Sequence, residues 1–321
     1  MHFLVIIMLF ISGCSTNDIE VPSLKVLSNA QQQAYLSKSA PVRHYGFSVF
    51  SQINGKIGVK GKARLHPNHI AKMPMFENDI PMILIGGRNQ SYNHYALLDL
   101  ASPTSWMEFS QSQNLRSHFL TFRDQNIPYG GRYDTGGINA FAAVVPQIRI
   151  DKLFIENIPL YVRMAMGPLG PQSRGIHHAE LKTILGYDLL KEFSMIQFDF
   201  KNKNIHFAST HAFQPNESLL LGKSPILQKE EAGLVVQGSL FGSPIPVVLD
   251  LAGKFHLTLP NNDEKITRQF SMGNLVFRQI PTDRFDGLPR VGYELLKDLI
   301  ITICPQEGFV YFEHSPNVET I

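Results

Sequence analysis

Two aspartates occupy matching places in a repeated apolar block, and they are the residues of this sequence best suited to chemistry. The block Ala96-Leu-Leu-Asp-Leu-Ala101 recurs as Val247-Val-Leu-Asp-Leu-Ala252. If two lobes related by a two-fold axis bring Asp99 and Asp250 face to face, both carboxyl groups cannot ionise cheaply, and they share one proton. The ionised member can take a proton from water while the protonated member polarises a carbonyl group. The pair therefore predicts acid–base hydrolysis that uses no metal and no other cofactor.

A second repeated block indicates that whole lobes are duplicated. Gly186-Tyr-Asp-Leu-Leu-Lys-Glu-Phe193 recurs as Gly292-Tyr-Glu-Leu-Leu-Lys-Asp-Leu299, with five of the eight positions identical. The Asp blocks and the Gly-Tyr blocks follow one another in the same order, with similar apolar runs around them. We therefore expect an N-terminal lobe over residues 41–214 and a C-terminal lobe over residues 215–321.

The elements that must position these residues are short strands. Apolar and β-branched runs cover residues 47–53, 56–63, 82–85 and 95–98, and Gly-containing turns separate them. No stretch keeps a helical period beyond about ten residues. The pattern predicts a mostly β protein with two homologous barrel-like lobes, short helices and a cleft between the lobes.

Both kinds of block resemble the active-site segments of one family, the pepsin-like and retropepsin-like aspartic peptidases. Leu97-Leu-Asp-Leu-Ala-Ser102, with Trp106 seven residues past the Asp, is similar to the first active-site loop of pepsin-like enzymes. Ile184-Leu-Gly-Tyr-Asp-Leu-Leu resembles the apolar-apolar-Gly segment of retropepsin-like domains, and the second lobe repeats both patterns. The resemblance covers residues 80–314 and implies a bilobal endopeptidase that hydrolyses peptide bonds in peptide or unfolded protein substrates.

The Asp loops also depart from the family pattern. The family's Thr and Gly after each Asp are replaced by Leu and Ala, at Leu100-Ala101 and Leu251-Ala252, so the hydroxyl bridges between the loops are impossible. Ser102 can still hydrogen-bond Asp99, whereas Gly253 offers nothing to Asp250. Two hypotheses therefore stand: an active aspartic endopeptidase, or a weak or inactive relative that uses the same cleft to bind a peptide or an envelope component.

A Gly-rich segment before residue 140 resembles the flap hairpin that closes over substrate in this family. Tyr129 is the candidate for the flap tyrosine that contacts Trp106, and Tyr133 is the second choice; an ordinary Gly-rich hairpin is the alternative. Asp134 begins a literal Asp-Thr-Gly. We do not assign it to the catalytic pair, because no apolar strand leads into it and it has no repeat partner.

Two further pairs receive ordinary interpretations. His177 and His178 have no acidic or thiol ligands at metal-binding spacing, so we expect a solvated loop. Asp188 and Glu294 match each other in the repeat, and we expect them to be exposed residues in the first turns of short helices.

The N-terminus predicts export and a lipid anchor. Residues 3–11 form an unbroken apolar run, too short to span a bilayer, which ends in Ile11-Ser12-Gly13-Cys14. This resembles the lipobox of bacterial lipoproteins, so we expect a signal peptide over residues 1–13, lipid attachment at Cys14 and a polar tether over residues 14–40; an ordinary signal peptide is the alternative. Ser15 in place of a retention Asp favours the outer membrane, facing the periplasm. The net charge of +2, with both signs interspersed, argues against nucleic acid as a partner.

Overall fold

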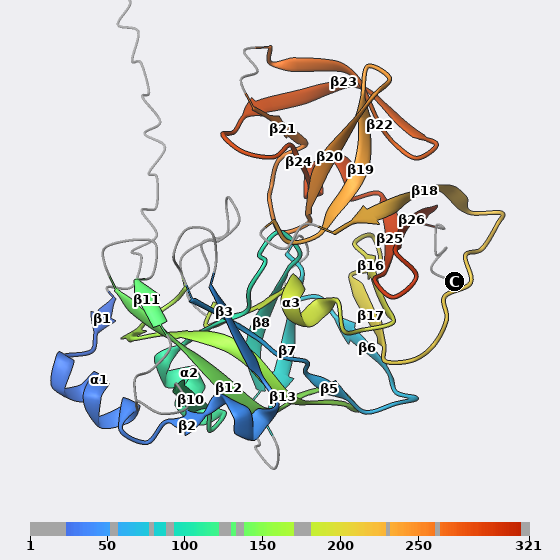
Figure 1. Ribbon diagram of the computed structural model, residues 1–321. Coiled ribbons are helices and arrows are strands. Elements are labelled where there is room, and N and C mark those ends of the chain that lie inside the picture. The colour runs from blue at the N-terminus through green and yellow to red at the C-terminus, as the bar shows by residue number, and fades with distance from the viewer. Residues whose placement is uncertain are drawn as a thin grey trace, which may run out of the picture.

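The protein is built mostly of β-strands in two lobes. The computed structural model describes residues 24–51, 57–76, 80–87, 93–121, 130–132, 138–169, 181–228, 232–260 and 264–315. Of the described residues, 54% lie in strands and 11% in helices, and the strands close two six-stranded barrels, which confirms the predicted fold class (Figure 1).

The N-terminal barrel closes through the long hairpin that its last two strands form. In order around the barrel, its strands are β7 (Met82–Gly86), β8 (Asn93–Asp99), β15 (Thr183–Gly186), β9 (Trp106–Glu108), β13 (Leu153–Arg163) and β12 (Asn139–Ile150). Arg149 of β12 pairs with Gly86 of β7 to complete the ring. Shorter strands extend this sheet: β2 (Ala40–Pro41), β5 (Arg64–Leu65), β10 (His118–Thr121) and β11 (Gly130–Arg132).

The C-terminal barrel repeats the same strand order. Its strands are β19 (Val235–Leu240), β20 (Ser243–Asp250), β24 (Arg290–Gly292), β21 (Leu257–Leu259), β23 (Leu275–Arg284) and β22 (Ile266–Met272). Leu240 of β19 pairs with Phe270 of β22 to close it. The duplication read from the sequence blocks therefore extends to whole barrels.

One region of six strands joins the two lobes. Its strands run in the order β6 (Ile70–Pro74), β17 (Asn204–Ala208), β16 (Met195–Asp199), β25 (Leu299–Cys304), β26 (Phe309–His314) and β18 (Leu220–Leu227). It continues into the C-terminal barrel because β18 also pairs with β19. At its centre β16 and β25 are antiparallel, with Ile196 opposite Ile303 and Gln197 opposite Thr302. One strand of this central pair, β16, comes from the first half of the chain, and the other, β25, comes from the second half. The pair therefore lies where the two related halves meet.

The helices are short. α3 (Tyr187–Leu190) and α4 (Tyr293–Leu296) follow the equivalent strands β15 and β24, and α2 (Phe109–Asn114) follows β9. A 3-10 helix, η1 (Val42–Tyr45), precedes the hairpin of β3 (Ser48–Ser51) and β4 (Ile57–Lys60).

The structure shortens the expected tether, because residues 24–40 belong to the N-terminal lobe. β1 (Lys25–Val26) pairs with β14 (Ala165–Met166), and α1 (Asn29–Leu36) starts with a capping box between Ser28 and Gln31. Leu36 is buried in the main core, and the ring of Tyr35 lies 4.6 Å from that of Phe109. These apolar contacts, sparse in a polar stretch of sequence, hold the segment on the lobe.

Candidate active site

Each aspartate is the last residue of a buried strand, and the parallel neighbour of that strand ends at a glycine. Asp99 is the last residue of β8 and lies opposite Gly186 in the parallel register with β15; Asp250 lies opposite Gly292 in the same way. β15 pairs with both β8 and β9, so the loop after Asp99 must cross over it. Because the apolar residues before each Asp are buried, the strand carries the carboxyl group into the interior.

The two glycines leave room for the Asp loops. A Cβ atom at Gly186 would lie 2.5 Å from the backbone of Thr104, and one at Gly292 would lie 2.2 Å from the carbonyl oxygen of Phe255. The next residue of each block binds the loop: the N–H of Tyr187 donates to the Ser102 carbonyl at 2.8 Å, and that of Tyr293 donates to Gly253 at 2.9 Å. The Gly-Tyr blocks therefore hold the Asp loops in place.

Each Asp loop also packs against the opposite lobe. Ala101 lies in one buried cluster with Val235 and Val248 of the C-terminal barrel. Ala252 lies in another with Met82 and Leu97 of the N-terminal barrel. The methyl groups of Ala101 and Ala252 thus make contacts across the lobe boundary in both halves.

Apolar and backbone contacts hold the two Asp loops at Leu100 and Leu251. Leu100 and Leu251 are buried in the main core, at 1% and 0% exposure. The N–H of Leu234 donates to the carbonyl of Leu100 at 2.7 Å, which ties the C-terminal lobe to the first Asp loop. The Leu-Ala departures are therefore compatible with a packed interface between the loops.

The two carboxyl groups are fully buried, and each has one oxygen with a partner and one without. Asp99 Oδ1 accepts hydrogen bonds from the N–H groups of Ala101 and Ser102, at 3.0 and 3.1 Å. Asp250 Oδ2 accepts one from Nη1 of Arg290 at 3.1 Å. The remaining oxygens, Asp99 Oδ2 and Asp250 Oδ1, are buried and have no protein partner within normal hydrogen-bond geometry. Such oxygens are costly unless a proton or a ligand satisfies them.

The two groups influence each other's titration. Burial, and then the neighbouring Asp250 carboxylate, raise the pKa of Asp99 to about 7 against the opposing effect of its backbone hydrogen bonds. Burial also raises the pKa of Asp250, while Arg290 and the N–H groups of Gly253 and Ala252 oppose the rise. At least one of the two carboxyl groups is thus suited to hold a proton near neutral pH.

The loop residues support the aspartates mainly through the backbone. The Ser102 hydroxyl donates to the carbonyl of Thr104 at 2.7 Å, so this residue supports Asp99 by its N–H. The N–H of Gly253 donates to the main-chain carbonyl of Asp250 at 3.1 Å and opposes the rise in the pKa of that residue. A backbone N–H donor is present whatever the side chain, so the side-chain types of the loop residues do not predict which of them support the aspartates.

Trp106 is half-buried beside the base of the predicted flap. Its ring lies 5.3 Å from that of Tyr161. It also packs against Ile138, the residue before β12, and Ala140, the second residue of β12. β11 pairs antiparallel with residues 139–141 of β12. Tyr129, Tyr133 and Asp134 lie outside the described residues, as do Cys14, His177 and His178.

The matched residues Asp188 and Glu294 have different environments. The expectation of an exposed Asp188 is wrong: its carboxylate accepts hydrogen bonds from the Ser105 hydroxyl at 2.7 Å and the Ser105 N–H at 3.1 Å. Burial raises the pKa of Asp188 to about 6, while these hydrogen bonds oppose the rise. Glu294 instead pairs with Lys297 at 3.0 Å, with nearly a third of its side chain exposed. The Ser105–Asp188 pair fixes the end of the first Asp loop, since the Ser105 hydroxyl oxygen also accepts from the N–H of Gly186.

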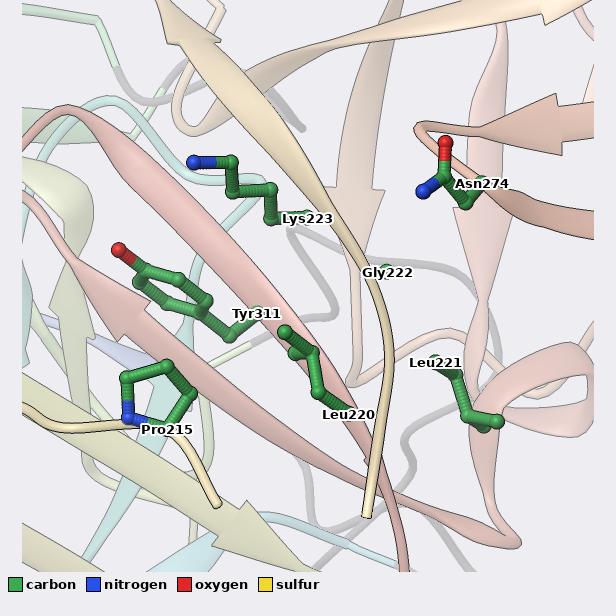
Figure 2. Close-up of a pocket in the computed structure, with 7 residues that line it drawn as sticks. All are labelled: Pro215, Leu220, Leu221, Gly222, Lys223, Asn274 and Tyr311. Atoms are coloured by element: carbon green, nitrogen blue, oxygen red, sulfur yellow. The ribbon is translucent and has the colours of Figure 1, made fainter. Parts of the chain in front are cut away.

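Other sites in the described part of the chain do not compete with the aspartates. Within those residues no group of three His, Cys, Asp or Glu side chains could hold a metal ion, and no helix is long and apolar enough to cross a membrane. Burial raises the pKa of the Cys304 thiol to about 12, which makes it unreactive. A hollow of about 290 Å³ next to β18 and β26 contains neither aspartate (Figure 2); its lining residues are Pro215, Leu220, Leu221, Gly222, Lys223, Asn274 and Tyr311.

The chain has no match among known protein-family models or among curated proteins. The duplicated geometry around Asp99 and Asp250 is therefore the basis for assigning a function.

Proposed function

We propose that the chain is an aspartic-type endopeptidase in which Asp99 and Asp250 share one proton. The observation that carries the proposal is their equivalence: each ends the same strand of a duplicated barrel, and each has one unpartnered buried oxygen. Their coupled titration is what a proton-sharing pair requires. The ionised carboxylate takes a proton from water, and the water oxygen attacks the peptide carbonyl while the protonated carboxyl group donates to its oxygen.

The proposed substrate is an extended peptide that adds a strand between the flap and the Asp loops. The β11–β12 pairing and the contacts of Trp106 with Ile138 and Ala140 support this position, because they connect the predicted flap to the strand that follows the first Asp loop. The buried carboxyl groups imply that a bound peptide must reach a site that water does not enter freely, which strengthens the electrostatic effects there.

The N-terminal sequence supports a cellular location for the proposed enzyme. We propose that Cys14 is acylated and that the lobes face the periplasm from the outer membrane of a bacterial envelope.

A binding protein without catalysis is the second candidate. The Arg290–Asp250 ion pair favours it, because an arginine engages one of the two carboxylates directly. In that function the same site would bind a peptide or an envelope component, and both aspartates would stabilise the conformation of their loops.

The deciding experiment is cleavage of an unfolded protein by the purified chain from residue 15 onward. Asp99→Asn and Asp250→Asn should each abolish cleavage while the far-UV circular dichroism stays unchanged, and Asp298→Asn, an exposed aspartate of the same lobe as Asp250, should retain it. No cleavage at any pH, with peptide still bound by both Asn variants, would favour the binding protein. Cleavage that persists in both variants would place the catalytic groups elsewhere.

A further inference from the structure

Arg290 gives the aspartate pair an asymmetry that the duplicated sequence does not predict. It is the first residue of β24, and the equivalent position in β15, two residues before the paired glycine, is the buried Ile184. Its Nη1 lies 3.1 Å from Asp250 Oδ2. The guanidinium also lies over the ring of Phe285, with Cζ 4.4 Å from the ring centroid.

The two carboxyl groups therefore have different stabilising partners. Asp99 Oδ1 accepts only from neutral backbone N–H groups, whereas Asp250 Oδ2 contacts a cation directly. Among charged groups, Asp250 raises the pKa of Asp99 and Arg290 lowers it, whereas Arg290 has the largest lowering effect on the pKa of Asp250. A full positive charge at contact distance favours the ionised form more than neutral donors do.

We propose that Arg290 is a positioning residue that fixes the negative charge of the pair on Asp250 and leaves the shared proton on Asp99. This inference rests on the proposed function and divides its two roles: Asp250 is the base and Asp99 is the acid. The oxygens left for chemistry are Asp250 Oδ1 and Asp99 Oδ2, the two that have no protein partner.

The assignment gives a balanced reaction. Asp250 takes one proton from water, the water oxygen bonds to the peptide carbonyl carbon, and Asp99 gives its proton to the carbonyl oxygen, which produces a neutral diol. Asp250 then gives its proton to the amide nitrogen as the C–N bond breaks, and one hydroxyl of the diol returns a proton to Asp99. The products are an amine and a carboxylic acid, and the pair regains its starting state.

The first test is the pH profile of kcat/KM. Arg290→Met should move the acidic limb upward by about one pH unit, because Asp250 loses the cation that favours its ionised form. Arg290→Lys should restore most of the profile, and Arg278→Met, an exposed arginine on β23, should leave it unchanged. An acidic limb that stays in place in Arg290→Met would overturn the inference, since a purely structural role changes stability without moving this limb.

The second test does not depend on activity. The carboxyl ¹³C resonances of the two aspartates, assigned by their loss in Asp99→Asn and Asp250→Asn, should titrate in wild type with Asp99 at the higher pH. In Arg290→Met the gap between the two midpoints should close or reverse. An unchanged gap would overturn the inference even if peptides are cleaved. The expected titrations without cleavage at any pH would instead defeat the proposed function and leave the charge assignment standing.

Discussion

Asp99 and Gly186 are register partners across the parallel strands β8 and β15, and the Cβ that Gly186 lacks would lie against the backbone of the loop that Asp99 begins. The repeated glycine is thus a spatial requirement of the repeated aspartate. Its φ of −83° suits any residue, so the requirement comes from close approach and not from backbone conformation.

Gly186→Ala should therefore damage the site more than an ordinary Gly→Ala change. The added methyl group must push the Thr104 backbone away, and we expect a loss of about 1–3 kcal/mol in the free energy of unfolding together with most of the proposed activity. Gly222→Ala is the matched control, because its nearest atom lies 3.1 Å away and its φ is ordinary. Urea unfolding of both variants tests this, and equal losses would contradict it.

Gly233→Ala should weaken the contact between lobes. Gly233 has a φ of +70°, and a Cβ there would lie 2.4 Å from the carbonyl oxygen of Leu100 in the opposite lobe. Gly242 has a similar φ of +86° with no atom within 4 Å, so Gly242→Ala measures the conformational strain alone. We expect the melting temperature to fall further for Gly233→Ala, and identical shifts would show that the interlobe contact is unimportant.

The stability gained by Asp99→Asn should depend on pH. Because the pKa of Asp99 is raised to about 7 from an ordinary value of 3.8, the folded wild type binds more protons than the unfolded chain between these values. Its stability therefore falls as pH rises through that window, and the Asn variant escapes this loss. The difference in melting temperature should be small near pH 4, grow toward pH 7 and then level off. A difference that does not change with pH, as expected for the exposed Asp298→Asn, would contradict the raised pKa.

Leu100→Thr combined with Leu251→Thr should destabilise the protein, although these changes introduce the Thr of the pepsin-like pattern that the Asp loops resemble. From the sequence alone, the added hydroxyl groups are expected to raise the rate of peptide cleavage or to leave it unharmed. Both leucines are buried in the main core, however, and each change removes apolar contacts and buries a hydroxyl group. We expect a loss of about 2 kcal/mol or more per site in unfolding experiments. Leu24→Thr, at a residue that is 42% exposed, is the control.

Cys14→Ser should release the protein from the membrane fraction or block its processing. The acylated thiol is the proposed anchor, and several acyl chains on one residue hold a protein firmly. Cell fractionation and labelling with radioactive palmitate provide the measurement. Cys304→Ala should keep both the label and the membrane location, since that thiol is buried. Unchanged labelling in Cys14→Ser would refute the anchor.

The sequence predicted the parts of this fold that the repeat encodes twice. Asp99 and Asp250, Gly186 and Gly292, and the two barrels follow from matched blocks, because equivalent residues in equivalent lobes keep the same register. The short strands between turns were predictable for the same reason that they form: apolar runs of their length bury one or both faces of a sheet.

The asymmetric parts were harder to predict. Arg290 was missed because a search for matching residues passes over a position that differs between the lobes; a lone charge before an apolar-Gly pair was the available signal. Asp188 was assigned to the surface as a first-turn residue of a short helix, and only the fold brings Ser105 to it. The capping box at Ser28 and Gln31 was a readable local signal for α1 that the polar composition obscured.

The central strands of the joining sheet have a mechanical consequence. β16 and β25 form a hydrogen-bonded seam, reinforced by a side-chain hydrogen bond of 2.9 Å from Gln197 to Thr302, and the flanking strands extend it into both halves of the molecule. Rotating one lobe against the other would shear this seam and expose Ile196 and Ile303, which are fully buried. We therefore expect the two lobes to move as one body, and a ligand to reach the carboxyl groups through movement of loops and not through separation of the lobes.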